Sequence, residues 1–293
     1  MKKIRLAIFF NNLRGLKTLY FLKKKKKIEV IKVYLAKKNL NKNIEKLLKK
    51  KSIKFEIIKN VNDIKIYNFI KKKNIDFNVL AGFPYILKKK IIYSAKVATI
   101  NLHGGRLPEY RGGSPLNWQI INGEKYIGIS ILKTEEKIDS GEIIIEKKFL
   151  LKENYNIKKV HEIANKYFQK ITYQAIEKLL KKKHKFKKIV LKKSNYYPQR
   201  SQSDGKINWK KMNSRKINNL IRACSHPYPG AFTFNSQKKK VTIFDAKLTN
   251  IQNKKLQLGE VIKCKNFYFV KSKPKILKIV NFEGRISKGE ILN

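Results

Sequence analysis

Three polar side chains near the middle of the chain, Asn101, His103 and Asp139, have the chemical types needed for acyl-type transfer. An Asn amide can donate a hydrogen bond to an oxygen that becomes negative during addition to a carbonyl. An imidazole can take or give a proton near neutral pH, and Asp139 can orient that ring or accept a proton from a nucleophile. The set contains no Ser or Cys nucleophile, which favours direct transfer to an outside nucleophile without a covalent enzyme intermediate.

The segments around these residues are typical of a strand end followed by turns. Ala98–Ile100 is apolar and leads directly into Asn101 and His103, whose spacing of two places both side chains on the same side of a strand. A loop rich in Gly and Pro runs from Gly104 to Pro115, and Asp139-Ser140-Gly141 lies on a later turn. Polar residues gathered at a strand end and on such a loop are a common way to build an active site.

The first third of the chain alternates between strand-like and helix-like segments. This alternation predicts an α/β, Rossmann-like and mostly parallel sheet with flanking helices. No G-x-G-x-x-G follows the first strand, so a dinucleotide site gains little support. The expected strands are 3–10, 29–35, 53–58 and 77–81, and the expected helices end near Leu22 or span 41–50 and 64–72.

The second half of the chain predicts one more strand, one long helix and then a change of structural class. Residues 142–150 alternate like a strand, and 160–180 have the apolar spacing of an amphipathic helix. Short strand-like runs after Phe232 predict a small C-terminal β-barrel, OB-like in type. We expect His161 to be a surface or capping residue and His226 to have a structural role. The expected domains are residues 1–193 and 207–293, joined by a polar linker over 194–206.

Composition excludes some classes and leaves one question open. The 42% hydrophobic content of the 293 residues indicates a folded chain, and no apolar run reaches the roughly 20 residues that span a bilayer. MKKIRLAIFF is interpreted as a first strand, and a cytoplasmic location is expected. The two cysteines lack metal-site spacing, so no metal is expected. The formal charge of +50 suits nucleic acid, but only eight of the 70 basic residues are Arg, which favours a general compositional bias.

Four motifs lie around the three polar side chains: Asn101-Leu102-His103-Gly104, Leu107-Pro108-x-Tyr110-Arg111-Gly112, Ser114-Pro115-Leu116-Asn117-Trp118 and Asp139-Ser140-Gly141. Together they resemble the signature of the 10-formyltetrahydrofolate-dependent formyltransferases. A C-terminal pattern also resembles that family: Asp204-Gly205-x-Ile207-x-Trp209, then Ile221-Arg222-Ala223, then Pro227-Tyr228-Pro229-Gly230-Ala231-Phe232. The resemblance therefore covers most of the chain from about Leu80.

The resemblance implies a formyltransferase fold and 10-formyltetrahydrofolate as co-substrate, with Asn101, His103 and Asp139 as the catalytic residues. It implies that an acceptor amine attacks the formyl carbon while Asn101 stabilises the oxygen. His103 would stabilise that oxygen or move a proton, and Asp139 would hold His103 or take the amine proton. The aromatic residues after the fourth strand would cover a pterin ring, although ordinary core packing explains them equally well from the sequence alone. The implied folate contacts are Phe83, Pro84, Tyr85, Leu87, Gly105, Arg106, Leu107, Pro108, Glu135, Glu136, Lys137 and Ile138.

The acceptor is the least determined part of this interpretation, and an amino-sugar nucleotide is expected ahead of Met-tRNA. The residues of Leu116-Asn117-Trp118 and of the C-terminal motifs favour an amino-sugar nucleotide as acceptor, as in UDP-4-amino-4-deoxy-L-arabinose formyltransferase. The charge and the second domain instead suit Met-tRNA, the acceptor of methionyl-tRNA formyltransferase. Two further alternatives are a formyltetrahydrofolate hydrolase and a non-catalytic RNA-binding protein. The complete Asn-His-Asp set disfavours the latter, because binding alone has no need of it.

Overall fold

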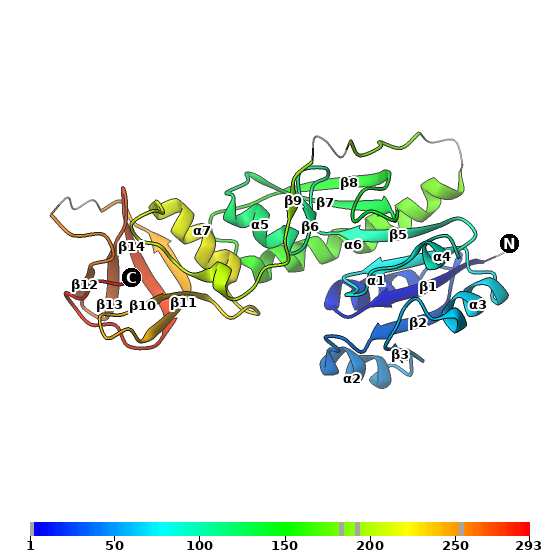
Figure 1. The fold of residues 1–293 in the computed structure, drawn as a ribbon, viewed down its shortest axis with the longest axis horizontal. Coiled ribbons are helices and arrows are strands. Elements are labelled where there is room, and N and C mark those ends of the chain that lie inside the picture. The colour runs from blue at the N-terminus through cyan, green and yellow to red at the C-terminus, as the bar shows by residue number, and fades with distance from the viewer. Residues whose placement is uncertain (1–2, 182–184, 191–193, 252–254) are drawn as a thin grey trace. The chain divides into compact units, whose positions relative to one another are not determined.

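The computed structural model describes residues 3–181, 185–190, 194–251 and 255–293, and the chain forms two compact units (Figure 1). The first unit contains residues 1–112, 128–148 and 162–196. The second contains residues 113–127, 149–161 and 197–293. Each unit is therefore assembled from more than one stretch of the chain, and the domain boundaries expected from the sequence stay a prediction.

A seven-stranded sheet forms the centre of the first unit, in the order β3-β2-β1-β4-β5-β7-β8. The pairs from β3 to β5 are parallel, and β7 runs antiparallel to β5. The predicted mostly parallel α/β sheet is therefore confirmed. The strands are β1 (Ile4–Phe10), β2 (Ile28–Ala36), β3 (Glu56–Ile58), β4 (Phe77–Ala81), β5 (Ala98–His103), β7 (Tyr126–Lys133) and β8 (Ile143–Leu150).

Three helices of this unit, α1 to α3, begin at polar caps and bury one apolar side. Asn12, Asn41 and Asp63 each accept a hydrogen bond from a backbone N–H of the first turn of the helix that follows. In α3 the buried Ile66 and Ile70 are one helical turn apart and therefore lie on the same side of the helix. The helices are α1 (Leu13–Lys23), α2 (Lys42–Lys50), α3 (Ile64–Lys72), α4 (Lys89–Ile92) and α6 (Ile157–Leu180), whose first five residues belong to the second unit.

A buried polar network ties β4 to β5 and α4, and so fixes the strand that carries the site. The Asn78 side chain is fully buried and donates to Ser94 Oγ at 3.0 Å and to Thr99 Oγ1 at 3.1 Å. Thr99 in turn donates to the Ile92 carbonyl at 2.5 Å. These donors all have acceptors, so the network favours one arrangement of β5, although the buried Asn78 Oδ1 has no hydrogen-bond partner.

The second unit is built on a five-stranded antiparallel sheet in the order β10-β11-β14-β13-β12. Helix α7 packs on it, and the core between them includes Trp209, Ile217, Ile221 and Ile243. The predicted change to a small β-rich C-terminal domain is thus confirmed. Its elements are α5 (Pro115–Ile121), α7 (Ser214–Cys224), β10 (Ala231–Phe234), β11 (Lys240–Leu248), β12 (Val261–Cys264), β13 (Phe267–Lys271) and β14 (Ile276–Glu283).

Three short elements lie outside both sheets. The two-residue strands β6 (Arg111–Gly112) and β9 (Tyr196–Tyr197) pair with each other, and η2 (Ser203–Gly205) is a single 3-10 turn. Within the described residues, no helix has both the length and the apolar character that a bilayer crossing requires.

Candidate active site

Strand β5 carries two of the expected catalytic side chains at its C-terminal end. Asn101 and His103 contact the same carboxylate, which confirms that they project from the same side of the strand. The strand backbone is held between them, because Arg14 Nη1 donates to the Leu102 carbonyl at 2.8 Å. The Arg14 guanidinium also lies 4.5 Å from the centre of the buried Phe168 ring on α6. Arg14 therefore connects α1, α6 and the site-bearing strand.

Asp139 reaches these residues from the loop between β7 and β8. Its carboxylate accepts from Asn101 Nδ2 at 3.2 Å and from the Gly112 N–H at 3.0 Å, and lies 3.4 Å from His103 Nδ1. Its backbone has φ of 48°, a left-handed conformation that non-glycine residues adopt at a cost. The contacts of the carboxylate stabilise that conformation and aim the side chain at the end of β5.

The hydrogen bonds of His103 restrict where its proton can be. Nε2 lies 2.6 Å from the Tyr110 carbonyl oxygen, and a carbonyl only accepts, so Nε2 carries a proton. Nδ1 faces the Asp139 carboxylate, and both side chains are buried, with 6% and 7% exposed. The imidazole is therefore held between the Tyr110 carbonyl and the Asp139 carboxylate.

Arg111 fixes the loop that carries Asp139. Its Nε and Nη2 donate to the Ile138 carbonyl at 3.2 and 2.6 Å, and Nε also donates to the Asp139 carbonyl at 3.1 Å. Nη1 donates to Ser194 Oγ at 2.9 Å. The sequence alone predicted no role for Arg111, although this residue lies in the motif that runs from Leu107 to Gly112. Gly141 closes the loop, since a Cβ there would lie 1.9 Å from the Lys133 carbonyl oxygen.

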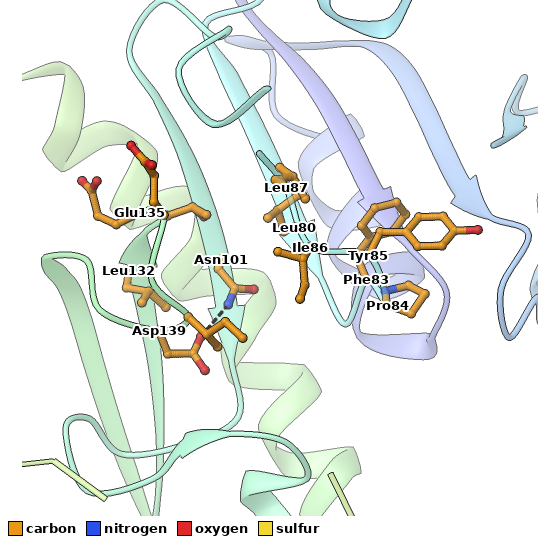
Figure 2. Close-up of a pocket in the computed structure, with 13 residues that line it drawn as sticks. Leu80, Phe83, Pro84, Tyr85, Ile86, Leu87, Asn101, Leu132, Glu135 and Asp139 are labelled. Atoms are coloured by element: carbon orange, nitrogen blue, oxygen red, sulfur yellow. Dashed lines mark hydrogen bonds between the residues drawn. The ribbon is translucent and has the colours of Figure 1, made fainter. Parts of the chain in front are cut away.

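A pocket of about 190 Å³ opens beside Asn101 and Asp139 (Figure 2). Figure 2 shows Asn101 joined to Asp139, with Phe83, Pro84 and Tyr85 on one side of the pair and Glu135 on the other. The full lining is Leu80, Phe83, Pro84, Tyr85, Ile86, Leu87, Asn101, Leu132, Thr134, Glu135, Glu136, Ile138 and Asp139. Largely apolar walls with a few polar groups at one end suit a flat heteroaromatic ring.

The aromatic residues of the loop after β4 serve both the core and the pocket. Phe83 packs edge-on against Phe9 and Tyr85, with ring centres 5.5 Å apart in each pair. Tyr85 Oη donates to the Ile58 carbonyl at 3.4 Å. On the opposite wall, Tyr93 donates to Glu135 at 2.5 Å, and this hydrogen bond, with smaller effects of burial and nearby carboxylates, raises the pKa of Tyr93 to about 12. Both walls are thus fixed by internal contacts.

The structure brings most of the expected folate contacts to this pocket and leaves others outside its lining. Phe83, Pro84, Tyr85, Leu87, Glu135, Glu136 and Ile138 line it, whereas Lys137 and the 105–108 loop do not. Leu107 packs with Leu132 and Ile143, and the Gly105 carbonyl accepts from Ser130. Pro108 is half-buried, and Arg106 pairs with Glu109 at 3.5 Å. Catalytic and folate-binding roles stay predictions. Leu80, Ile86, Leu132 and Thr134 are lining residues that the sequence did not indicate.

Several motif residues in the second unit have internal partners. Asn117 is buried and donates to the Ala223 carbonyl at 2.8 Å, and Trp118 Nε1 donates to the Pro198 carbonyl at 3.0 Å. Trp209 Nε1 donates to Thr233 Oγ1 at 3.0 Å. His161 Nε2 lies 3.1 Å from Tyr228 Oη. These side chains stabilise the second unit. The motifs that contain them therefore say little about which acceptor the protein uses.

Comparison with known protein families gives matches to two models. Residues 6–176 match a model described as formyl transferase. Residues 200–288 match a model described as formyl transferase, C-terminal domain. The first match contains the Asn101, His103 and Asp139 cluster and its pocket.

Among curated proteins, the chain is similar to the bifunctional polymyxin resistance protein ArnA of Wigglesworthia glossinidia brevipalpis. The two are 34% identical over 206 residues, which cover 69% of this chain and 31% of that longer protein. The methionyl-tRNA formyltransferase of Thermodesulfovibrio yellowstonii is 32% identical over 221 residues, which cover 73% of this chain and 68% of that enzyme.

Solved structures share the fold over nearly the whole chain. WlaRD, a sugar 3N-formyl transferase crystallised with dTDP and 5-N-formyl-THF, superposes with a TM-score of 0.70 at 20% identity, covering 98% of this chain and all of that one. An N-formyltransferase from Helicobacter canadensis, in complex with folinic acid and dTDP-3-aminofucose, gives 0.69 at 18% identity, covering 97% and 100%. At these identities the comparison establishes the fold.

Proposed function

The chain belongs to the formyl transferase family, and we propose that it transfers a formyl group from 10-formyltetrahydrofolate to the amino group of methionyl-tRNA. The observation that carries formyl transfer at this site is the convergence of Asn101, His103 and Asp139 at the end of β5, beside a pocket with mostly apolar walls. The enzyme is a formyltransferase, and the acceptor is the proposed part.

The pocket beside Asn101 suits the ring end of a folate. Its volume of about 190 Å³ is below the ~300–1,000 Å³ typical of sites that enclose a whole ligand, so the remainder of a folate would extend beyond it. Phe83, Leu87 and Ile138 supply apolar surface, and Glu135 and Thr134 supply polar atoms. The bound folate supplies an activated formyl group.

The side chains divide the remaining work between them. One Nδ2 proton of Asn101 is bonded to Asp139, so the second can donate to the formyl oxygen as negative charge develops there. Asp139 can accept a proton from the attacking amine, and His103 holds that carboxylate from the other side. His103 lies outside the pocket lining, which favours an action through Asp139.

Charge and sequence similarity favour a tRNA acceptor. The formal charge of +50 attracts a polyanion such as tRNA more strongly than it attracts a sugar nucleotide with two phosphates. Methionyl-tRNA formyltransferases of several organisms are 29–32% identical over 59–73% of the chain. An amino-sugar nucleotide is the second candidate, because sugar N-formyltransferases share the fold over nearly the whole chain.

The decisive experiment compares acceptors under one set of conditions. The purified chain is given 10-formyltetrahydrofolate with Met-tRNA, with UDP-4-amino-4-deoxy-L-arabinose or with dTDP-3-aminofucose, and formylated product is measured by mass spectrometry. We expect turnover with Met-tRNA and a KM for it that rises steeply between about 50 and 200 mM salt. Turnover with a sugar nucleotide alone would assign the second candidate, and release of formate without an acceptor would indicate a hydrolase.

The catalytic assignment is tested by Asn101→Ala. Loss of a preorganised oxyanion donor lowers turnover by about two to three orders of magnitude. Asn43→Ala, an exposed position on α2, serves as the matched control and should leave turnover unchanged. Wild-type turnover in a folded Asn101→Ala variant would rule out this assignment.

A further inference from the structure

The second unit contains a larger pocket that the formyl-transfer site does not use. Its volume is about 740 Å³, and all its lining residues belong to that unit. The segment 153–158, the end of α7, and strands β11 and β14 form its walls. We propose that this pocket binds a nucleoside phosphate, with the base stacked on His226 and the phosphate near Lys158 and Lys247. This site would be additional to the proposed function.

An aromatic platform lies within the pocket. The His226 ring is stacked on the Phe244 ring, with centres 4.2 Å apart and planes at 8°. Phe244 is 6% exposed and belongs to β11, so it fixes one face of the imidazole. His226 itself is exposed, which leaves its other face accessible. A flat, supported ring with an open face is the arrangement on which nucleobases stack in single-strand-binding sites.

The wall opposite the sheet is held in place by Arg222. Its Nη1 donates to the carbonyls of Lys152, Glu153 and Tyr155 at 3.0, 3.3 and 3.3 Å, and its Nε and Nη2 donate to Asn219 Oδ1 at 3.1 and 2.8 Å. This guanidinium joins α7 to the loop that precedes α6. The pocket therefore has walls fixed by hydrogen bonds, and a ligand would meet a preformed site.

The polar groups in the pocket match the parts of a nucleotide. Within the described residues, the side chains of Asn154, Asn218 and Asn281 make no hydrogen bond to the protein, so their amides can pair with the donors and acceptors of a base edge.

The charged side chains of the pocket match the phosphate and the ribose of a nucleotide. Lys158 and Lys247 are exposed and can pair with a phosphate. The net positive charge of the whole chain also attracts a phosphate. Asp245 and Glu153 also line the pocket, and a carboxylate can accept from the ribose hydroxyls. Aromatic, amide and cationic groups together favour a nucleotide over a plain sugar or an isolated anion.

Equilibrium binding to the full chain, without folate, tests this site separately from catalysis. Titration calorimetry with CMP, UMP, AMP and GMP, and with cytidine and inorganic phosphate alone, measures what base and phosphate each contribute. We expect millimolar or tighter binding of at least one nucleotide, and weaker binding of its two parts. The ligand could be a free nucleotide or an unpaired nucleotide within an RNA strand, and a short single-stranded RNA such as ACCA distinguishes the two. If the RNA binds more tightly than the free nucleotide, the occupant is an unpaired nucleotide of an RNA strand.

Variants assign the binding to this pocket. His226→Ala should weaken binding about tenfold or more, whereas His226→Phe, which keeps a flat ring, should retain most of it. Lys247→Ala should weaken the binding of the nucleotide but leave the binding of the nucleoside unchanged. The controls are Phe267→Ala, a half-exposed aromatic on β13, and Lys240→Ala, an exposed lysine elsewhere on β11.

Two results would overturn the proposal: binding weaker than about 10 mM for every nucleotide, or nucleotide binding that His226→Ala leaves unchanged. The second result would place the nucleotide elsewhere on the chain. Because these measurements need neither folate nor turnover, they can fail while Asn101→Ala still abolishes formyl transfer, and the reverse also holds.

Discussion

Replacing Asp139 by Asn is the most informative single change at the site, because each oxygen of its carboxylate accepts from a different donor. Asn101 Nδ2 and the Gly112 N–H donate to different oxygens, and His103 Nδ1 lies 3.4 Å from the second oxygen. Asn has nearly the same shape but only one acceptor oxygen. Its NH₂ group therefore takes the place of one acceptor, and it cannot accept from Asn101 Nδ2 or from the Gly112 N–H.

The expected changes in stability and in kcat follow from the interactions that Asp139→Asn removes. One buried donor loses its acceptor, which costs about 1–3 kcal/mol in the free energy of unfolding. The variant also loses the group that can accept a proton from the amine, and Asn101 loses its anchor. General acid–base groups contribute about 10²–10⁴-fold to turnover, so we expect kcat to fall by at least about 100-fold.

Two measurements on each variant separate these effects. Urea unfolding gives the change in stability, and single-turnover formylation gives the rate of the chemical step. Asp63→Asn is the matched control, because Asp63 is exposed and caps α3, a position where Asn serves as well as Asp. If Asp139→Asn is folded and keeps its rate within about threefold of wild type, the carboxylate does not act on the reacting groups and our reasoning is wrong.

Three further changes test the support of the site. Arg111→Lys keeps the charge but loses the fork that holds the Ile138 and Asp139 carbonyls, so we expect kcat to fall about 10- to 100-fold with little change in the folate KM, measured by steady-state kinetics. Gly141→Ala should displace the Asp139 loop, because its Cβ would meet the Lys133 carbonyl at 1.9 Å; unfolding and turnover should both change, and a fully active, equally stable variant would contradict the close approach. Asn78→Ala removes the hydrogen bonds between β4, α4 and β5 and should lower the free energy of unfolding by about 1–3 kcal/mol, detected as a lower urea midpoint; an unchanged midpoint would show that the network is not stabilising.

Much of the fold was predictable because its signals are local. The helix over 64–72 and the strand over 77–81 occur with the predicted bounds, since each combines apolar periodicity with a clear start signal. The long helix begins at Ile157, three residues before its predicted start, because Asn156 accepts from the Lys159 N–H and caps it there. The expected third strand is shorter, Glu56–Ile58, as only these residues pair with β2.

The site was predictable only where its residues are close in sequence. The spacing of two on β5 was sufficient to place Asn101 and His103 on one side of the strand. The roles of Arg111, Arg14 and the Gly112 N–H were not predicted, because each acts on a backbone or carboxylate group distant in sequence. The acceptor argument from Asn117 and Trp118 lost its support for the same reason, since their partners are Ala223 and Pro198.

The sequence by itself determined the α/β class, the β-rich second part, and the identity of three side chains able to act on a carbonyl. Only the tertiary structure decided that Asp139, 38 residues beyond Asn101, accepts its hydrogen bond, and that a stacked His226 lies in a second pocket. The physical reason is that periodicity and capping depend on neighbours in the chain, whereas convergence depends on strand order. The adjacency of β4, β5 and β7 is set by packing over the whole sheet, and no short stretch of sequence records it.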